Sequence, residues 1–96
     1  NYNFSAVNAD GKSINYKITS PDTVEVTFDD NYYSGNIVIP DTVNNNGRIY
    51  TVRDIGERTF YNCSGLTSVS IHNSVTFIGE RAFADCTALI SNLSLG

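Results

Sequence analysis

The sequence has no tryptophan, no methionine, two prolines, two cysteines and one histidine among its 96 residues. A zinc site or a catalytic triad needs more histidine and cysteine, with suitably spaced partners, than this composition supplies. The 6 basic residues against 10 acidic ones give a net charge of −4, which argues against nucleic acid and anionic membranes as partners. EF-hand spacing and glycine-rich phosphate motifs are also missing. We therefore expect no catalytic residue, no cofactor and no metal.

The composition that remains is that of one small globular domain. Hydrophobic residues make up 41% of the chain and charged residues 17%, which fits a folded protein and not a disordered one. No apolar run is long enough to cross a bilayer. The chain is rich in Asn, Ser, Thr and Tyr and poor in Lys, a composition that is common in exported proteins. It begins at Asn1 without an initiator Met or a signal-peptide pattern, which suggests removal of an upstream segment.

The most informative pattern is a phrase that occurs twice. Residues 55–66 are IGERTFYNCSGL and residues 78–89 are IGERAFADCTAL, an offset of 23. Self-similarity at a period in the low twenties is typical of a leucine-rich solenoid, in which stacking buries the apolar face of each coil. We predict one core that contains Ile55, Phe60, Cys63, Leu66, Val69, Ile71, Val75, Ile78, Phe83, Cys86 and Leu89, with Phe60 stacked on Phe83.

The first third of the chain carries strand patterns instead of the repeat. Apolar residues alternate with polar ones over residues 14–18, and again over 24–28 with Val24, Val26 and Phe28 on one face. We therefore predict that residues 1–34 form an N-terminal β-cap, because the terminal coil of a solenoid needs a cover.

The repeats occupy residues 35–96 and belong to the same structural domain as the cap. They divide into an irregular coil at 35–54, a repeat at 55–77 and a partial repeat at 78–96. The irregular coil carries an insertion at 44–49, whose Asn-Asn-Asn-Gly stretch predicts a turn.

Within the repeats, alternating apolar residues predict a strand at 66–71. Residues 57–62 and 80–85 are expected to form one or two short helical turns, because a coil of this length has no room for a long helix. The predicted fold class is an α/β solenoid, β-rich, with about two and a half right-handed coils behind the cap.

Cys63 and Cys86 lie one period apart, so they are expected directly above one another. A disulfide is one interpretation, since exported proteins often contain them. However, stacked strands place parallel side chains about 4.7–4.9 Å apart, whereas a disulfide needs converging Cβ atoms about 3.8 Å apart. We therefore expect free, buried thiols.

Together these phrases resemble the leucine-rich repeats of BspA-like bacterial surface proteins. The resemblance covers residues 35–95 and rests on the spacing Ile55-Gly56-x-x-x-Phe60-x-x-Cys63-x-x-Leu66-x-x-Val69-x-Ile71. His72 departs from it, because these repeats usually have Pro there. The resemblance implies a secreted or cell-surface bacterial protein with an adhesive or host-interaction role.

The expected function is that of a non-catalytic, surface-exposed binding module for a protein or glycan ligand. The alternative is a structural spacer, or the end segment of a longer repeat protein, without a ligand of its own. The candidate ligand-binding residues are positions expected to line one strand face: Glu25, Thr27, Val38, Ser68, Ser70, His72 and Ser94. The alternative, which is preferred for any single one of them, is a solvated polar strand face.

Residues 89–95 form an apolar strand pattern with no successor in the sequence. An unpaired edge of this kind can pair with another chain. Either the chain is part of a longer array, or it self-associates, and a two-fold contact would satisfy both edges. We predict a homodimer through this edge.

Overall fold

The computed structural model describes residues 2–89 and 93–95, and within them the chain forms nine strands and no helix. The strands are β1 (Phe4–Val7), β2 (Ser13–Ser20), β3 (Thr23–Thr27), β4 (Gly35–Val38), β5 (Thr42–Asn45), β6 (Arg48–Ile55), β7 (Leu66–Ile71), β8 (Phe77–Ile78) and β9 (Leu93–Leu95).

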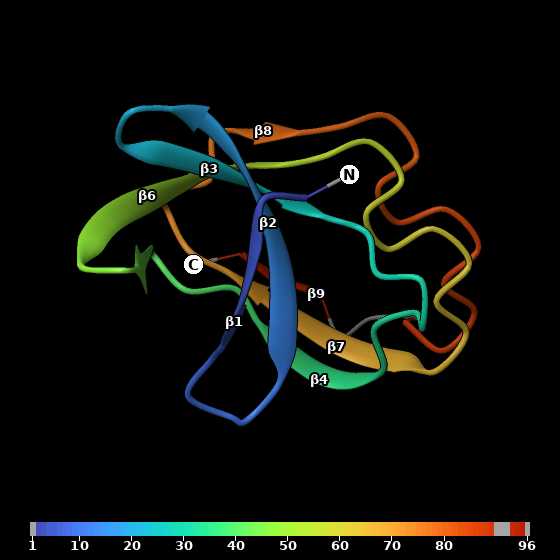
Figure 1. Ribbon diagram of the computed structural model, residues 1–96. Coiled ribbons are helices and arrows are strands. Elements are labelled where there is room, and N and C mark those ends of the chain that lie inside the picture. Colours follow the sequence, from blue (N-terminus) through green and yellow to red (C-terminus); the bar gives the residue numbers. More distant parts are fainter. Residues whose placement is uncertain (1, 90–92, 96) are drawn as a thin grey trace.

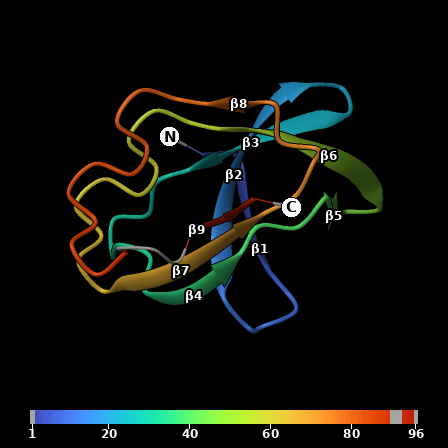
Figure 2. The same ribbon diagram turned by 180° about the vertical axis from the view of Figure 1, so that it is seen from behind.

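These strands form two sheets with the core between them (Figure 1; Figure 2 gives the view from behind). The larger sheet has the order β1-β2-β3-β6-β5, and β8 also pairs with β6. The smaller sheet has the order β4-β7-β9, and both of its pairings are parallel. β3, β6 and β8 are likewise parallel to one another. In both sheets, a strand thus pairs in parallel with the strand that the chain forms after crossing to the other sheet and back. This is the pattern of a stack of coils.

Three coils follow from this topology. In each, a strand of the larger sheet leads through a turn segment to a strand of the smaller sheet: β3 to β4, β6 to β7, and β8 to β9. β3 lies inside the segment predicted as cap, but it pairs in parallel with β6 and so begins the first coil. The turn segments, residues 28–34, 56–65 and 79–88, lie together at the right of Figure 1, and we call this the turn side.

The short helices predicted at 57–62 and 80–85 are absent from the described structure, and this part of the α/β prediction was wrong. Arg58, Asn62, Arg81 and Asp85 have φ between 56° and 60°, a left-handed conformation that interrupts a right-handed helix. The amide groups of residues 58, 60 and 62 donate instead to the carbonyl oxygens of residues 80, 82 and 84 in the next coil, at 3.1, 2.7 and 2.8 Å. The backbone is thus bonded between coils on the turn side as well as in the sheets.

The β1–β2 hairpin covers one edge of the smaller sheet. Asn8 Nδ2 donates to the carbonyl oxygen of Val38 in β4 at 2.9 Å, and Lys12 Nζ donates to that of Ser34 at 3.3 Å. These contacts satisfy carbonyl groups that a bare edge strand would leave open to another chain. A second hairpin, β5–β6, occupies the predicted insertion, and its turn residues Asn46 and Gly47 have positive φ, as the sequence indicated.

The core follows the predicted repeat slots at most positions. Ile55, Phe60, Cys63, Leu66, Val69 and Ile71 are buried, and Val75, Phe83, Cys86 and Leu89 are partly buried against them. Phe60 stacks on Phe83 as predicted, with ring centroids 5.1 Å apart, and Tyr33 extends the stack at 5.2 Å on the other side. Ile78 is an exception, because its side chain is 41% exposed. It lies in β8, which within the described structure pairs only with β6.

The C-terminal edge strand also has a partner within the chain. β9 pairs in parallel with β7, with Leu93 opposite Val69 and Leu95 opposite Ile71. Residues 90–92, which belong to the segment predicted to dimerise, lie outside the described residues. Self-association through residues 89–95 stays a prediction.

The central position of Phe60 leads to a stability prediction. Phe60→Ala would empty a fully buried site between Tyr33 and Phe83, and it should lower the free energy of unfolding by about 3–5 kcal/mol. Phe77→Ala is the matched control, because Phe77 is 61% exposed and its loss should change stability by about 0.5 kcal/mol or less. Urea unfolding measures both, and equal losses in the two variants would contradict the assignment of Phe60 to the core.

A second prediction concerns Gly79, the second residue of the partial repeat. A Cβ at Gly79 would lie 2.5 Å from Glu57 N and 2.8 Å from Gly56 C, both backbone atoms of the coil beneath. Gly79→Ala should therefore destabilise the protein by at least about 1–3 kcal/mol. In Gly65→Ala the added carbon would meet the Ser34 Cβ at 3.4 Å, an ordinary contact, so this control should stay within about 1 kcal/mol of wild type. Thermal or urea unfolding that ranks the two variants in the opposite order would contradict the close approach.

Candidate functional site

Four of the predicted site residues belong to the strand face of the smaller sheet. Val38 in β4 and Ser68 and Ser70 in β7 alternate with the buried residues of their strands, and Val38 is opposite Ser70. Ser94 is opposite Ser70 on the other side, in β9, where only the backbone is described. Ser68 Oγ donates to Asn36 Oδ1 at 2.7 Å. Apart from Val38, the described side chains of this group are polar and uncharged, and Ser68 is hydrogen-bonded within the face.

His72 lies directly after β7, near residues of the first coil. Its Nδ1 is 4.0 Å from Asp41 Oδ1, and Ser74 Oγ donates to the same carboxylate oxygen at 3.1 Å. The carboxylate therefore links two coils at this corner. The geometry gives His72 an ion-pair partner when it is protonated.

Glu25 and Thr27 do not belong to this face, so the prediction of one continuous face was wrong for both. They lie in β3 of the larger sheet, and the chain passes through residues 28–34 before it reaches β4. Thr27 is buried and its hydroxyl donates to the Asn15 carbonyl at 3.4 Å. Glu25 packs its carboxylate over Gly56, where a Cβ would lie 2.6 Å from Glu25 Oε2.

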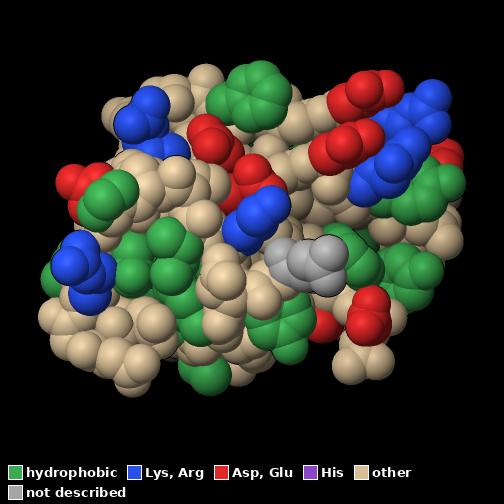
Figure 3. All heavy atoms as spheres, turned by 45° about the horizontal axis from the view of Figure 1, so that its top comes forward, with side chains coloured by type: hydrophobic (Ala, Val, Ile, Leu, Met, Phe, Trp, Pro, Cys, Tyr) green, Lys and Arg blue, Asp and Glu red, His purple; other side chains and the backbone are tan. Residues whose placement is uncertain are grey.

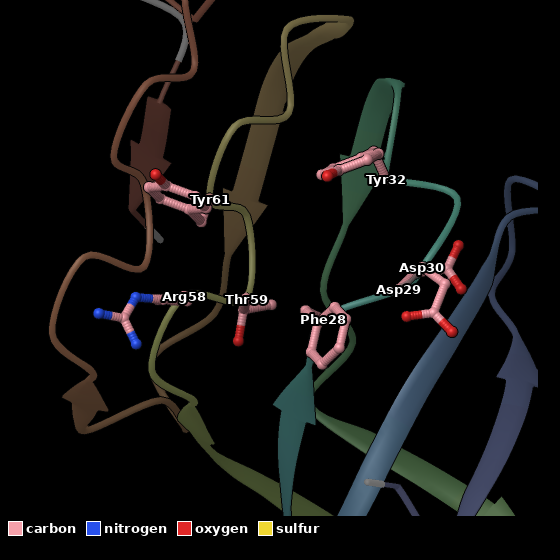
Figure 4. A pocket seen from close by; sticks show the side chains of 7 residues that line it. All are labelled: Phe28, Asp29, Asp30, Tyr32, Arg58, Thr59 and Tyr61. Atoms are coloured by element: carbon pink, nitrogen blue, oxygen red, sulfur yellow. The ribbon is translucent and has the colours of Figure 1, made fainter.

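The turn side instead carries a hollow of about 240 Å³ that the sequence analysis missed. Figure 4 shows the seven side chains around it, which come from two successive coils. The first coil contributes Phe28, Asp29, Asp30 and Tyr32, and the second contributes Arg58, Thr59 and Tyr61. The aromatic side chains are unusually open for their size, at 46% exposed for Phe28, 53% for Tyr32 and 40% for Tyr61. Exposed aromatic groups that gather around a concavity are typical of a binding surface.

An extra length of chain in the first coil creates this hollow. Val26, Ile55 and Ile78 occupy equivalent strand positions, and Tyr33, Phe60 and Phe83 occupy equivalent core positions. Seven positions separate Val26 from Tyr33, whereas five separate Ile55 from Phe60 and Ile78 from Phe83. The two additional residues push Phe28 outward, although the alternation of β3 predicted that it would share a face with Val24 and Val26.

Local backbone conformation then directs the aromatic rings. Tyr32 has φ of 59°, a left-handed conformation that is uncommon outside glycine, and it faces outward while Tyr33 enters the core. Tyr33 is fixed there by its hydroxyl, which donates to the Thr27 carbonyl at 2.6 Å and accepts from Asn15 N at 3.0 Å. Burial raises the pKa of the Tyr33 hydroxyl, so it stays protonated as a donor.

Asp29, Arg58 and Thr59 of the hollow are held by neighbouring groups. Asp29 Oδ1 accepts from Asn15 Nδ2 at 3.3 Å, and Arg58 Nη1 lies 3.3 Å from Glu57 Oε2. The Thr59 hydroxyl is held between the carbonyl oxygens of Val26 and Gly56, at 2.9 and 2.8 Å, so it is committed to the fold. Figure 3 shows acidic and basic side chains beside hydrophobic ones on the part of the surface it presents.

The sequence contains a signal that would have located this hollow. Each coil needs one aromatic side chain at the stacked core position, and Tyr32 and Tyr61 are therefore surplus aromatic residues next to it. The repeat itself marks Tyr61 as an addition, since Ala84 stands at the equivalent position 23 residues later. Aromatic residues that exceed the needs of the core are candidates for recognition.

Both cysteines are free, as predicted, and neither is arranged for chemistry. Burial raises the pKa of the Cys63 thiol from 9.0 to about 11 and raises that of Cys86 as well. Cys86 Sγ donates to the Phe60 carbonyl at 2.8 Å. A thiol that is kept protonated is a poor nucleophile and a poor metal ligand.

The described residues contain no group of three or more His, Cys, Asp or Glu side chains placed to hold a metal ion. They also contain no long apolar helix of the kind that crosses a bilayer. The geometry on both faces is that of a rigid repeat scaffold which displays side chains, and the class of protein is a β-rich leucine-rich-repeat coil stack.

The comparison with protein families agrees with this class. A family model described as "BspA type Leucine rich repeat region (6 copies)" matches residues 25–95. The chain belongs to this family, as its sequence pattern indicated. The match begins within β3, in the segment that the sequence analysis assigned to the cap. None of the curated proteins matches the chain significantly.

Solved structures of bacterial leucine-rich-repeat proteins have the same fold. A leucine-rich repeat protein from Bacteroides capillosus is 32% identical over 86% of this chain, with a TM-score of 0.74. A leucine rich cell surface protein from Faecalibacterium prausnitzii is 29% identical over 99% of the chain, with a TM-score of 0.75. A leucine-rich repeat protein from Bacteroides ovatus is 31% identical over 86%, with a TM-score of 0.71. The chain spans 61%, 24% and 21% of these three proteins, respectively.

The Cys63 thiol generates a prediction on pH dependence. The folded state holds its proton up to about pH 11, whereas the unfolded thiol has the ordinary pKa of 9.0. Its contribution to stability is therefore fully present below about pH 9 and is lost as the pH rises toward 11. Urea unfolding of wild type and Cys63→Ala at pH 8 and about pH 10.5 should show a smaller difference in stability at the higher pH.

The comparison between the two proteins removes other titrations from this measurement. Burial also raises the pKa of Tyr16, to about 12, and that of Tyr33, so alkaline pH should destabilise both proteins through these phenols. Because both proteins keep the tyrosines, the change in their difference belongs to Cys63. A difference that is the same at both pH values would contradict a buried, protonated thiol.

Proposed function

We propose that the protein is a non-catalytic binding module at a bacterial cell surface, and that it recognises a protein partner through the aromatic hollow of its turn side. The observation that carries the proposal is the group of three exposed aromatic side chains around that hollow, Phe28, Tyr32 and Tyr61. Tyrosine is enriched among the residues that dominate the energy of protein interfaces, especially in central pockets. Among the described side chains, the strand face around Ser70 offers no such anchor.

The surface location is supported by the family and by one structural neighbour. The chain belongs to the BspA type repeat family, and the Faecalibacterium prausnitzii neighbour is described as a cell surface protein. A repeat scaffold whose coils are bonded to one another in both sheets and on the turn side suits an adhesive role, because it holds the backbone that carries its recognition residues in a fixed arrangement. Fixed side chains lose less entropy on binding than mobile ones.

A displayed random-peptide library tests the proposal, with the immobilised 96-residue protein as target. Enriched peptides should bind wild type and lose at least about fivefold in affinity to Tyr61→Ala, the effect of removing an interface anchor. Ser70→Glu is the matched control on the strand face and should leave binding unchanged. Circular dichroism melts of both variants check that they are folded.

Two outcomes would contradict the proposal. Loss of binding in Ser70→Glu together with full binding in Tyr61→Ala would place the site on the strand face. The second outcome has two parts: the enriched peptides bind Tyr61→Ala as well as wild type, and a glycan binds wild type but not Tyr61→Ala. In that case the ligand of the hollow would be a carbohydrate and not a protein.

A further inference from the structure

The three aromatic rings of the hollow provide the kind of surface that attracts a positive charge. The face of an aromatic ring carries a negative potential, which attracts a cation that lies within about 6 Å of the ring centre. Phe28, Tyr32 and Tyr61 project around one concavity from two coils (Figure 4). Their exposure leaves the rings open to a ligand, unlike the core ring of Phe60.

Two carboxylates adjoin these rings on the Phe28 side of the hollow. Asp29 and Asp30 follow Phe28 directly in the chain, and Figure 4 shows both on the far side of its ring from Arg58. The hydrogen-bond donor to Asp29 is the neutral amide of Asn15, at 3.3 Å. A neutral donor orients the carboxylate without cancelling its charge, so its attraction for a cation remains.

Arg58 is the basic residue of the hollow, and its charge is directed elsewhere. Its guanidinium points away from the Phe28 ring in Figure 4 and lies 3.3 Å from the Glu57 carboxylate. The same pairing recurs in the next coil between Glu80 and Arg81, at 3.9 Å. Arg58 is thus part of a repeated ion pair of the turn side, and the uncompensated charge of the hollow is negative.

Asp29 and Asp30 form an acidic wall of the first hollow, and this wall also borders a second hollow. A second hollow of about 210 Å³ lies across the wall and is lined by Tyr2, Asn15 and Asn31 in addition to the three shared residues, Phe28, Asp29 and Asp30. The two concavities therefore flank one acidic and aromatic ridge. A long side chain can occupy one of them while the backbone that carries it passes over the ridge.

We propose that the first hollow receives the side chain of a lysine or arginine of the protein partner, with the alkyl portion or guanidinium plane on the aromatic rings and the positive charge toward Asp29 and Asp30. This inference rests on the proposed function. It names the group that the hollow recognises and predicts that the partner presents a basic, exposed segment. The net charge of −4 favours the approach of such a segment at low ionic strength.

Short peptides that differ at one residue test the inference by NMR titration of the 96-residue protein. The probes are acetylated and amidated pentapeptides with lysine, arginine, norleucine or glutamate between flanking glycines. At low salt the lysine and arginine peptides should bind about fivefold or more tightly than the norleucine peptide, and the glutamate peptide should bind least. The advantage over norleucine should shrink as the ionic strength rises from about 0.01 M to about 0.15 M.

Variants identify the groups responsible. Asp30→Asn should reduce lysine-peptide binding toward the norleucine level, and Tyr61→Ala should weaken binding of both peptides. Asp10→Asn is the matched control, because it removes the same charge from an exposed position in the β1–β2 turn, outside both hollows. It should leave the preference for lysine intact. Equal effects of Asp30→Asn and Asp10→Asn would overturn the assignment to the hollow, since net charge alone would then explain the preference.

Other outcomes separate this inference from the proposed function. If norleucine and lysine peptides bind equally and both are lost in Tyr61→Ala, the cationic preference is overturned while a protein-binding hollow stands. If the binding of library peptides depends on Tyr61 but the peptides are not enriched in lysine and arginine, the cationic preference is likewise overturned and the protein-binding hollow stands. Tetramethylammonium is a free small cation. If it competes with the lysine peptide and binds as tightly, the claim that the hollow recognises a cationic side chain of a protein would be overturned.

Discussion

The close approach of successive coils at the start of each repeat sets the geometry of the whole molecule. Gly56 N donates to the Val26 carbonyl at 2.9 Å, and Gly79 N donates to the Ile55 carbonyl at 2.7 Å, each across one coil spacing. No side chain fits at Gly79, because a Cβ there would overlap the backbone of Glu57. This glycine is therefore a requirement of stacking, and the rings of Phe60 and Phe83 stack across the same pair of coils.

The sequence predicts the parts of the fold that depend on repetition. Equal spacing of identical residues was sufficient to place Phe60 against Phe83, to bury Leu66 and Val69, and to leave the two thiols free. It failed where the neighbouring coil changes the outcome. A short helical turn at 57–62 was expected from the length of the coil, but the backbone there bonds to the next coil, with Arg58 and Asn62 in the left-handed conformation.

The errors in the site prediction have a related cause. Alternation within β3 locates inward and outward positions, but it cannot say which of the two sheets the strand joins. Glu25 was therefore assigned to the face of Ser70, although β3 pairs with β6. The hollow was missed because its residues are departures from the pattern: two additional positions in the first coil and Tyr61 where the next repeat has Ala84. Repetition specifies the scaffold, and irregularities of this kind are where recognition residues can be added without loss of stacking.

Because the hollow is built from two coils, folding and recognition are linked. Phe28, Asp29, Asp30 and Tyr32 come from the segment after β3, and Arg58, Thr59 and Tyr61 come from the segment after β6. These segments adjoin only when the coils are stacked, so a ligand that spans them binds the stacked state and stabilises it. Thr59 contributes to both folding and recognition. Its buried hydroxyl bonds to the carbonyl oxygen of Val26 in the first coil and to that of Gly56 in its own coil. The same contact that holds the coils together thus holds the two walls of the hollow at a fixed separation.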